Sequence, residues 1–202
     1  MFEGYSSALQ RLTERQQLLL SAIVLIIAFS LRALVRGDYV GAIALALAVA
    51  IGFVFHELSH RRTAIKLGYI ARYRLWPTGL LLALLLSIIT LGRVVFAAPG
   101  AVVIYPRFHW MPVSRSDYFK IAASGPLANI VIGLLSYLAL HLPLTLPVYI
   151  ILLYIAYVNL FLALFNLLPI PPLDGYTVFR YSIKYWMVLF IVAAIPFITL
   201  LY

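Results

Sequence analysis

Long apolar runs separated by short polar segments dominate the chain. Five runs approach or exceed the roughly 18 apolar residues that indicate a membrane-spanning helix; they cover residues 17–35, 39–60, 118–140, 148–168 and 185–202. A sixth run, 80–91, is of marginal length for a crossing. The pattern predicts an all-α polytopic membrane protein with about five to six transmembrane helices. The first run could instead belong to a signal peptide, but Arg32 and Arg36 and the lack of a small-residue cleavage site favour a retained helix.

The Lys and Arg residues test whether run 80–91 crosses the membrane. If it crosses, the fifteen basic residues divide seven against eight between the two faces. If it dips in and returns, only Arg32 and Arg36 lie on the far side and thirteen share one face. The positive-inside rule favours the second arrangement. We therefore expect five full spans, a re-entrant or surface-lying segment at 80–91, a cytoplasmic N-terminus and a C-terminus outside.

Short β-structure is predicted between the second and third of the long runs. Polar and apolar side chains alternate over 69–76, which indicates a strand. Two β-prone runs, 94–98 and 101–105, flank Pro99-Gly100, a dipeptide typical of turns, and are predicted to pair as a hairpin. We expect a small membrane-associated β-hairpin or strand element near the functional site.

Composition supports the membrane assignment. The chain is 65% hydrophobic, and only 10% of its residues are charged, against about 25% in soluble domains. The net charge of +9 would also suit a nucleic-acid-binding protein, but the basic residues are scattered between apolar runs. We interpret them as topology signals and lipid-headgroup contacts, with no nucleic-acid partner. The absence of cysteine excludes disulfides, thiolate ligands and thiol catalysis.

We expect a single transmembrane domain over residues 1–202. Its core would cover about 40–180, preceded by an N-terminal segment and first helix at 1–36 and followed by a last helix at 185–202.

The candidate chemistry lies at the end of the second run, where residues 54–60 read VFHELSH. His56 and His60 are four residues apart, so on a helix they share one face about a turn apart, with Glu57 beside it. H-E-x-x-H on a helix is the pattern of zinc hydrolases, in which two imidazoles bind the metal and a carboxylate takes a proton from water. A structural role is the alternative, although ionisable side chains in a membrane span are costly and mark functional sites.

A zinc site needs a third protein ligand and an open position for water. The acidic residues are Glu3, Glu14, Asp38, Glu57, Asp117 and Asp174. Glu3 and Glu14 lie in the polar N-terminal segment, and Asp38 lies about 27 Å from His56 along the helix. Asp117 is predicted to be a helix N-cap. Asp174 follows a proline-broken helix end, where a kinked backbone can turn a carboxylate inward, or it forms a simple Asp-Gly turn. The other histidines, His109 and His141, are expected at the surface.

Three segments together resemble a known family. Residues 56–60 (HELSH) and 166–175 (NLLPIPPLDG) resemble the two signatures of the site-2 protease family of intramembrane zinc metalloproteases. Residues 125–129 (GPLAN) resemble the small-residue segment between them. The resemblance covers about residues 40–180, in the expected order. Run 80–91 departs from shorter members of the family, which puts the local topology in question.

The resemblance implies a role for each motif residue. His56, His60 and Asp174 would bind Zn²⁺, and Glu57 would be the general base. Asn166 would help to orient or stabilise the reacting carbonyl, with contact between helices inside the membrane as the alternative. The small residues Gly125, Ala128 and Gly133 are expected to permit close helix packing.

The implied function is hydrolysis of a peptide bond in or near the transmembrane segment of a membrane-protein substrate. The partners would be that substrate and the lipid bilayer, with the active site towards the cytoplasmic face of a prokaryotic plasma membrane. The runs 94–98 and 101–105 would offer a strand edge to an unwound substrate, or simply cover the site. One rival is another class of membrane zinc protease with a glutamate ligand, although no Glu follows Glu57. The other is a non-enzymatic metal-binding membrane protein or metal transporter, which would not need Glu57.

Overall fold

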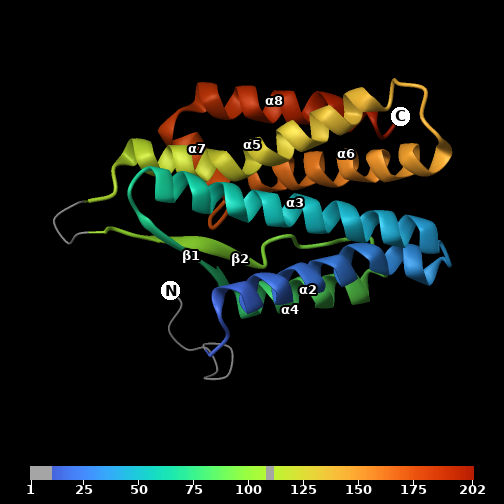
Figure 1. Ribbon diagram of the computed structural model, residues 1–202, viewed down its shortest axis with the longest axis horizontal. Coiled ribbons are helices and arrows are strands. Elements are labelled where there is room, and N and C mark those ends of the chain that lie inside the picture. Colours follow the sequence, from blue (N-terminus) through green and yellow to red (C-terminus); the bar gives the residue numbers. More distant parts are fainter. Residues whose placement is uncertain (1–10, 108–111) are drawn as a thin grey trace.

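The structure, a computed structural model, describes residues 11–107 and 112–202. The predictions made for Glu3 and His109 lie outside these residues. Helix α3 is central, with α2 and α4 on one side and α5 and α6 on the other, while α8 lies along α5 and α6 (Figure 1). The long helices are α2 (Glu14–Val35), α3 (Tyr39–Lys66), α5 (Arg115–Ala139) and α6 (Leu146–Asn166). The shorter elements are β1 (Ile70–Leu75), α4 (Pro77–Ile89), β2 (Gly100–Tyr105), α7 (Asp174–Tyr181) and α8 (Ile183–Thr199).

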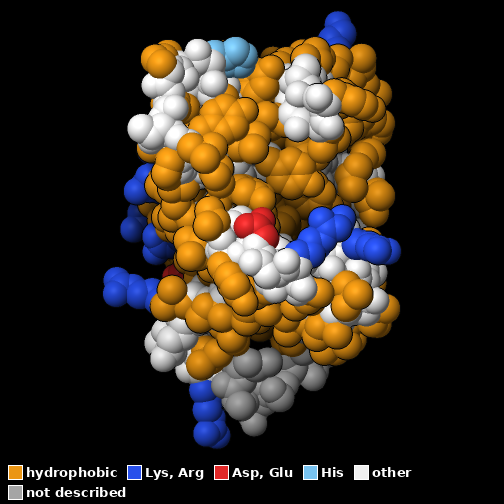
Figure 2. Space-filling model, turned by 90° about the vertical axis from the view of Figure 1, so that its right-hand side faces the viewer, with side chains coloured by type: hydrophobic (Ala, Val, Ile, Leu, Met, Phe, Trp, Pro, Cys, Tyr) orange, Lys and Arg blue, Asp and Glu red, His pale blue; other side chains and the backbone are white. Residues whose placement is uncertain are grey.

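Four helices of the described residues are long and apolar enough to cross a membrane, namely α2, α3, α5 and α6. The expected count of five to six is not confirmed, because α8 has 17 residues and α4 only 13. Large apolar side chains point outward from these helices; Ile43 on α3 is 72% exposed and Leu135 on α5 is 64% exposed. Figure 2 shows the same character at the end of the molecule that carries the α2–α3 turn, where hydrophobic side chains cover most of the surface. Such a surface suits a lipid environment.

Helix α4 accounts for the ambiguous run 80–91. It lies against α2 and ends where Gly92 contacts the backbone of Arg32, after which the chain returns toward β2 (Figure 1). Arg93 therefore lines the same cavity as Arg32 and Arg36. Thirteen basic residues were expected on one face and two on the other. This is wrong for Arg93, and the division becomes twelve against three. The asymmetry that favoured the re-entrant arrangement is kept.

The predicted strand at 69–76 is β1, but the predicted hairpin is wrong. β1 pairs antiparallel with β2, with Ile70 opposite Tyr105 and Leu75 opposite Gly100, while residues 94–99 form neither helix nor strand. The two-residue turns that close hairpins need a positive φ, and Gly100 is not among the described residues with positive φ. Phe96 instead packs edge-on against Trp76 and Phe165, which anchors the segment between helices.

Side chains of α2 cover the other edge of β1. Glu14 accepts a hydrogen bond from the Tyr73 backbone N–H at 3.0 Å, and Gln17 accepts one from the Leu75 N–H at 3.1 Å. Glu14 also pairs with Arg61 of α3 at 3.1 Å. The start of α2, β1 and α3 are therefore tied together, and a strand edge that would otherwise be open is closed.

Local sequence explains where the helices begin. Thr13 and Gln16 form a capping box at the start of α2, and the Asp38 carboxylate accepts the Gly41 N–H at 2.8 Å at the start of α3. The expected cap at Asp117 is wrong. Ser114 caps α5 and accepts the Asp117 N–H at 3.0 Å, while the Asp117 carboxylate, one turn inside, accepts the Tyr69 hydroxyl at 2.8 Å.

Candidate metal centre

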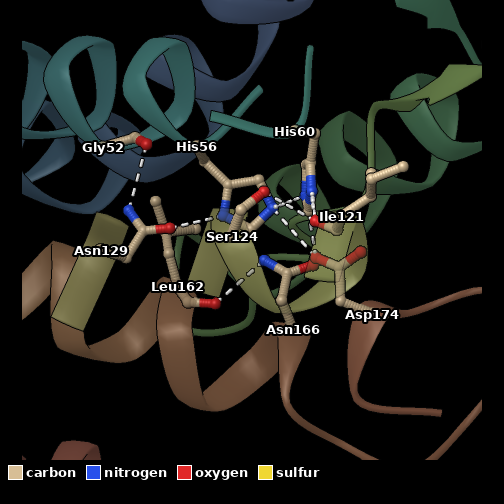
Figure 3. Close-up of polar contacts among 9 residues, drawn as sticks. All are labelled: Gly52, His56, His60, Ile121, Ser124, Asn129, Leu162, Asn166 and Asp174. Atoms are coloured by element: carbon tan, nitrogen blue, oxygen red, sulfur yellow. Dashed lines mark hydrogen bonds and ion pairs between the residues drawn. The ribbon is translucent and has the colours of Figure 1, made fainter. Parts of the chain in front are cut away.

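Two imidazoles and one carboxylate converge at the end of α3 nearest the β-strands. The Nε2 atoms of His56 and His60 lie 3.0 Å apart, and Oδ2 of Asp174 lies 3.2 Å from the first and 3.1 Å from the second. Figure 3 shows the Asp174 side chain turned toward both rings. These residues form a group of described His and acidic side chains able to hold one metal ion. The alternative, in which Asp174 forms only an Asp-Gly turn, is wrong, because Asp174 is the first residue of α7.

The spacing and the chemistry of these three atoms fit zinc. Ligand atoms at the corners of a tetrahedron around zinc, with bonds of about 2.0–2.1 Å, lie about 3.3–3.4 Å apart. The observed separations of 3.0 to 3.2 Å are close to this value. Two imidazole nitrogens and one carboxylate oxygen are also the ligand types that catalytic zinc sites use, with the fourth position open.

The helical spacing in α3 and one glycine in α5 bring the two imidazoles together. α3 continues past His60 to Lys66, so both histidines lie on regular helix within its C-terminal part. Gly125 of α5 packs against both rings, and a Cβ there would lie 2.7 Å from His56 Nε2 and overlap the His60 ring. The expectation that Gly125 permits close packing therefore applies to α5 against the histidines themselves.

The proline-rich segment after α6 positions Asp174. The backbone of Gly175 approaches that of Leu167 so closely that a Cβ would clash with it. The Leu167 carbonyl also accepts the Trp186 indole N–H at 2.6 Å, which ties α8 to the same turn. Burial raises the pKa of the Asp174 carboxyl, and the adjacent His60 and His56 imidazoles lower it. The effect of the imidazoles is the larger, so the pKa lies below its ordinary value.

Glu57 lies beside His56, His60 and Asp174, which we together call the metal cluster, and it is 7% exposed. Its Oε2 is buried and has no hydrogen-bond partner among the described residues. Glu57, both histidines and Asp174 all line one cavity of about 690 Å³, whose wall includes the whole of β2. A buried carboxylate oxygen without a partner needs a polar group or water to meet it, and the cavity offers the space.

The remaining predicted site residues are accounted for as follows. Asn166, the last residue of α6, lines the same cavity, and its side-chain N–H donates to the Leu162 carbonyl of its own helix at 2.9 Å. This bond lies within α6 and does not join two helices, as the alternative for Asn166 would require. His141 lies in the turn after α5 and is exposed, and its Nδ1 lies 3.3 Å from the Tyr137 carbonyl in the last turn of α5. Asp38 lies at the opposite end of α3 from the histidines.

The outer nitrogen of each histidine has its own partner. Nδ1 of His60 lies 2.7 Å from the Ile121 carbonyl, and Nδ1 of His56 lies 2.5 Å from Oδ1 of Asn129. Asn129 bonds in turn to Asn159 of α6 at 2.9 Å, and both asparagines are fully buried. Sequence reasoning missed Asn159. Its one signal is a polar amide in an otherwise apolar span, a type of residue that commonly joins helices in membranes.

Comparison with known proteins identifies the family. The sequence profile described as peptidase family M50 matches residues 144–190. A protein of Methanocaldococcus jannaschii named a "putative zinc metalloprotease" is 38% identical over 144 residues, which cover 70% of this chain and 72% of the relative. The chain belongs to peptidase family M50. No solved structure matches it.

Membership of family M50 confirms the resemblance to site-2 proteases and makes the protein a zinc metalloprotease. The metal-transporter alternative is therefore not supported. Zinc is the cofactor of M50 proteases, and the grouped His56, His60 and Asp174 side chains fit it.

Proposed function

We propose that the protein is an intramembrane protease that cleaves a peptide bond in or near the transmembrane segment of a membrane-protein substrate. The observation that carries this proposal is the position of two of the three candidate ligands, His56 and His60, within α3, a helix long enough to span a membrane. His56, Glu57 and His60 are all buried in that helix, and the cavity beside them is walled by other apolar helices. A soluble substrate would have little need for a site of this kind.

In this proposal His56, His60 and Asp174 are the zinc ligands. Zinc held there supplies a Lewis acid that polarises the scissile carbonyl and lowers the pKa of water. Glu57 takes the proton from the attacking water as the new C–O bond forms. It then delivers that proton to the leaving amine as the C–N bond breaks. The unpartnered Oε2 of Glu57 supports this role, because it leaves one oxygen free for water.

Asn166 is proposed to orient the scissile carbonyl or stabilise the charge that develops on it. Its side chain lines the same cavity as Asp174 and the two histidines, and one N–H is held by the Leu162 carbonyl (Figure 3). An amide has two N–H donors, so one is left for a substrate oxygen. A donor of this kind contributes about 3 kcal/mol in a protease in which it was measured.

The substrate is proposed to bind along β2. A transmembrane helix must unwind locally before its peptide bonds can be cut, and an unwound segment can add to a strand edge. Because the Tyr73 and Leu75 N–H groups point away from β2 toward α2, the residues opposite them on β2 also direct their backbone groups away from β1. These residues are Val102 and Gly100, and Ile104, two residues beyond Val102, has the same orientation, so all three present backbone groups on the edge that lines the cavity.

The active site is proposed to face the cytoplasm of a prokaryotic cell. The twelve basic residues at the end of the bundle that carries β1, β2 and the metal cluster support this orientation under the positive-inside rule.

The decisive experiment compares the wild type with Glu57→Gln in liposomes, on a substrate with one transmembrane helix. We expect the variant to bind one zinc ion per chain and to lose cleavage by at least the 10²–10⁴-fold that general base catalysis contributes. Normal cleavage by the variant would reject the mechanism. Cleavage of soluble peptides only, by the wild type, would reject the intramembrane substrate.

A further inference from the structure

The two buried asparagines form a chain of hydrogen bonds with a fixed direction. It begins at the Ile155 carbonyl, which accepts the Asn159 side-chain N–H at 2.9 Å. Asn159 Oδ1 accepts the Asn129 N–H at 2.9 Å, and Asn129 Oδ1 lies 2.5 Å from His56 Nδ1. The Gly52 carbonyl of α3 accepts a second N–H of Asn129 at 3.0 Å (Figure 3).

This chain settles which way each amide is turned. A backbone carbonyl only accepts hydrogen bonds, so the atoms facing the Ile155 and Gly52 carbonyls must be the NH₂ groups of Asn159 and Asn129. With both of its N–H donors used, Asn129 can offer His56 only its oxygen. Nδ1 of His56 must therefore be the N–H donor, and the lone pair of the ring lies on Nε2, facing Asp174.

We propose that Asn129 and Asn159 are positioning residues for the metal site, with Asn159 acting through Asn129. Asn129 selects the His56 tautomer and ring orientation that bind zinc, and Asn159 holds the Asn129 amide in the orientation that makes this possible. The inference rests on the proposed ligand set and deepens it. Through Asn159, α6 helps to orient a ligand of the metal cluster although it contributes no ligand itself. The partner of a ligating histidine raises ligand basicity as well as fixing the ring.

Burial keeps the two asparagine amides in this arrangement. Asn129 and Asn159 are both 0% exposed, so neither amide can exchange its partner for bulk water. Gly52 permits the approach, since a Cβ there would lie 2.9 Å from Leu162 and 3.1 Å from Asn159 Oδ1. A buried amide left without a partner is costly, so removal of one member disturbs the next one in the chain.

The test measures zinc affinity by competition with a chelator, on the full chain in detergent, together with the visible absorption spectrum of the Co²⁺-substituted protein. We expect Asn129→Leu to weaken zinc binding about 10–100-fold, as the loss of such partners does elsewhere, and to change the Co²⁺ spectrum. Asn159→Leu should weaken zinc binding by a smaller factor. The double variant should bind no more weakly than Asn129→Leu, because Asn159 acts through Asn129.

Two further variants separate positioning from general destabilisation. Asn129→Asp keeps an acceptor for His56 Nδ1, and when protonated its second oxygen can still donate one bond to the Gly52 carbonyl or to Asn159, so it should bind zinc more tightly than Asn129→Leu. Ser87→Ala removes another fully buried hydrogen bond, the 2.6 Å contact with the Ala28 carbonyl, and should leave zinc affinity and the Co²⁺ spectrum unchanged.

Wild-type affinity and spectrum in Asn129→Leu would overturn the proposal, as would an Asn129→Asp variant as weak as Asn129→Leu. An unchanged Asn159→Leu, or additive losses in the double variant, would remove Asn159 from it. If Asn129→Leu does not fold, Asn159→Leu and Asn129→Asp still decide the question. None of these readouts uses proteolysis, so failure of the proposed intramembrane activity would be seen separately, in the Glu57→Gln comparison.

Discussion

Nε2 of His60 and Oδ2 of Asp174 lie 3.1 Å apart, although 114 residues separate them along the chain. The contact brings the start of α7 to a turn of α3 that already carries the other histidine. Everything between them, including β1, β2 and two spanning helices, has to fold for the three ligand atoms to meet. The metal centre is therefore a product of the whole bundle, and zinc binding reports on its assembly.

Replacement of Asp174 by alanine tests the ligand set directly. We expect Asp174→Ala to weaken zinc binding by more than the roughly 10–100-fold that loss of an outer partner costs, because a ligand itself is removed. Chelator competition and metal analysis measure the effect. Asp38→Asn, which changes a carboxylate at the opposite end of α3, should bind zinc as the wild type does. Stoichiometric zinc at unchanged affinity in Asp174→Ala would contradict the assignment.

A methyl group at position 125 should disrupt the metal centre without removing any ligand. The Cβ of Gly125→Ala would overlap the His60 ring and press on His56. We expect lower zinc affinity and lower activity, measured by chelator competition and substrate cleavage.

Gly133→Ala is the matched control, because it lies two turns further along α5 and its Cβ would meet Leu160 Cγ at 2.7 Å. That variant should lower the thermal unfolding temperature while zinc affinity stays unchanged. Equal zinc affinities in the two variants would show that crowding of the imidazoles has no consequence.

The open edge of β2 can be blocked with proline. Proline lacks the N–H donor and is tolerated where that donor points away from the neighbouring strand. Ile104→Pro should therefore preserve the β1–β2 pairing and zinc binding, and reduce cleavage of a transmembrane substrate at least tenfold. Ile104→Val is the control and should cleave normally. Normal cleavage by a correctly folded Ile104→Pro would mean that the strand only covers the site.

Glu14 should stabilise the fold through the edge of β1. Glu14→Ala removes the acceptor for the Tyr73 N–H and the partner of Arg61. We expect a loss of about 0.5–1.5 kcal/mol in the free energy of unfolding, the usual contribution of one hydrogen bond, seen as a lower unfolding temperature. Glu14→Gln keeps an acceptor and loses only a partly exposed ion pair, so its loss should be smaller. Equal losses would assign the effect to charge.

Sequence was a good guide to the helices and to the grouping of the two histidines, for physical reasons that are local. The apolar runs had to be helices in a membrane, and the i, i+4 spacing of His56 and His60 placed both rings on one face before any tertiary contact was considered. Asp174 required more, because only a shortage of other acids and a family resemblance connected it with α3. The Gly175–Leu167 approach that positions it is invisible in the sequence.

The errors came from features that depend on tertiary packing. Pro99-Gly100 looks like a hairpin turn, but aromatic packing of Phe96 between Trp76 and Phe165 decides the path of that segment. Asn159 was missed because a single amide in an apolar run has no local pattern; its partner lies on another helix, 30 residues away. The last helix, α8, also ends earlier than the predicted run 185–202, because it stops at Thr199 after 17 residues.

The irregular backbone of residues 94–99 has a consequence for hydration. A lipid interior cannot satisfy peptide groups outside helices and sheets, so such a stretch persists at membrane depth only against protein or against a wet cavity. Ala97, Ala98 and Pro99 lie on the wall shared with the metal cluster. The peptide groups of this strip that no protein group meets require water, so in the proposed mechanism the strip would keep the cavity wet beside the site where hydrolysis consumes a water molecule.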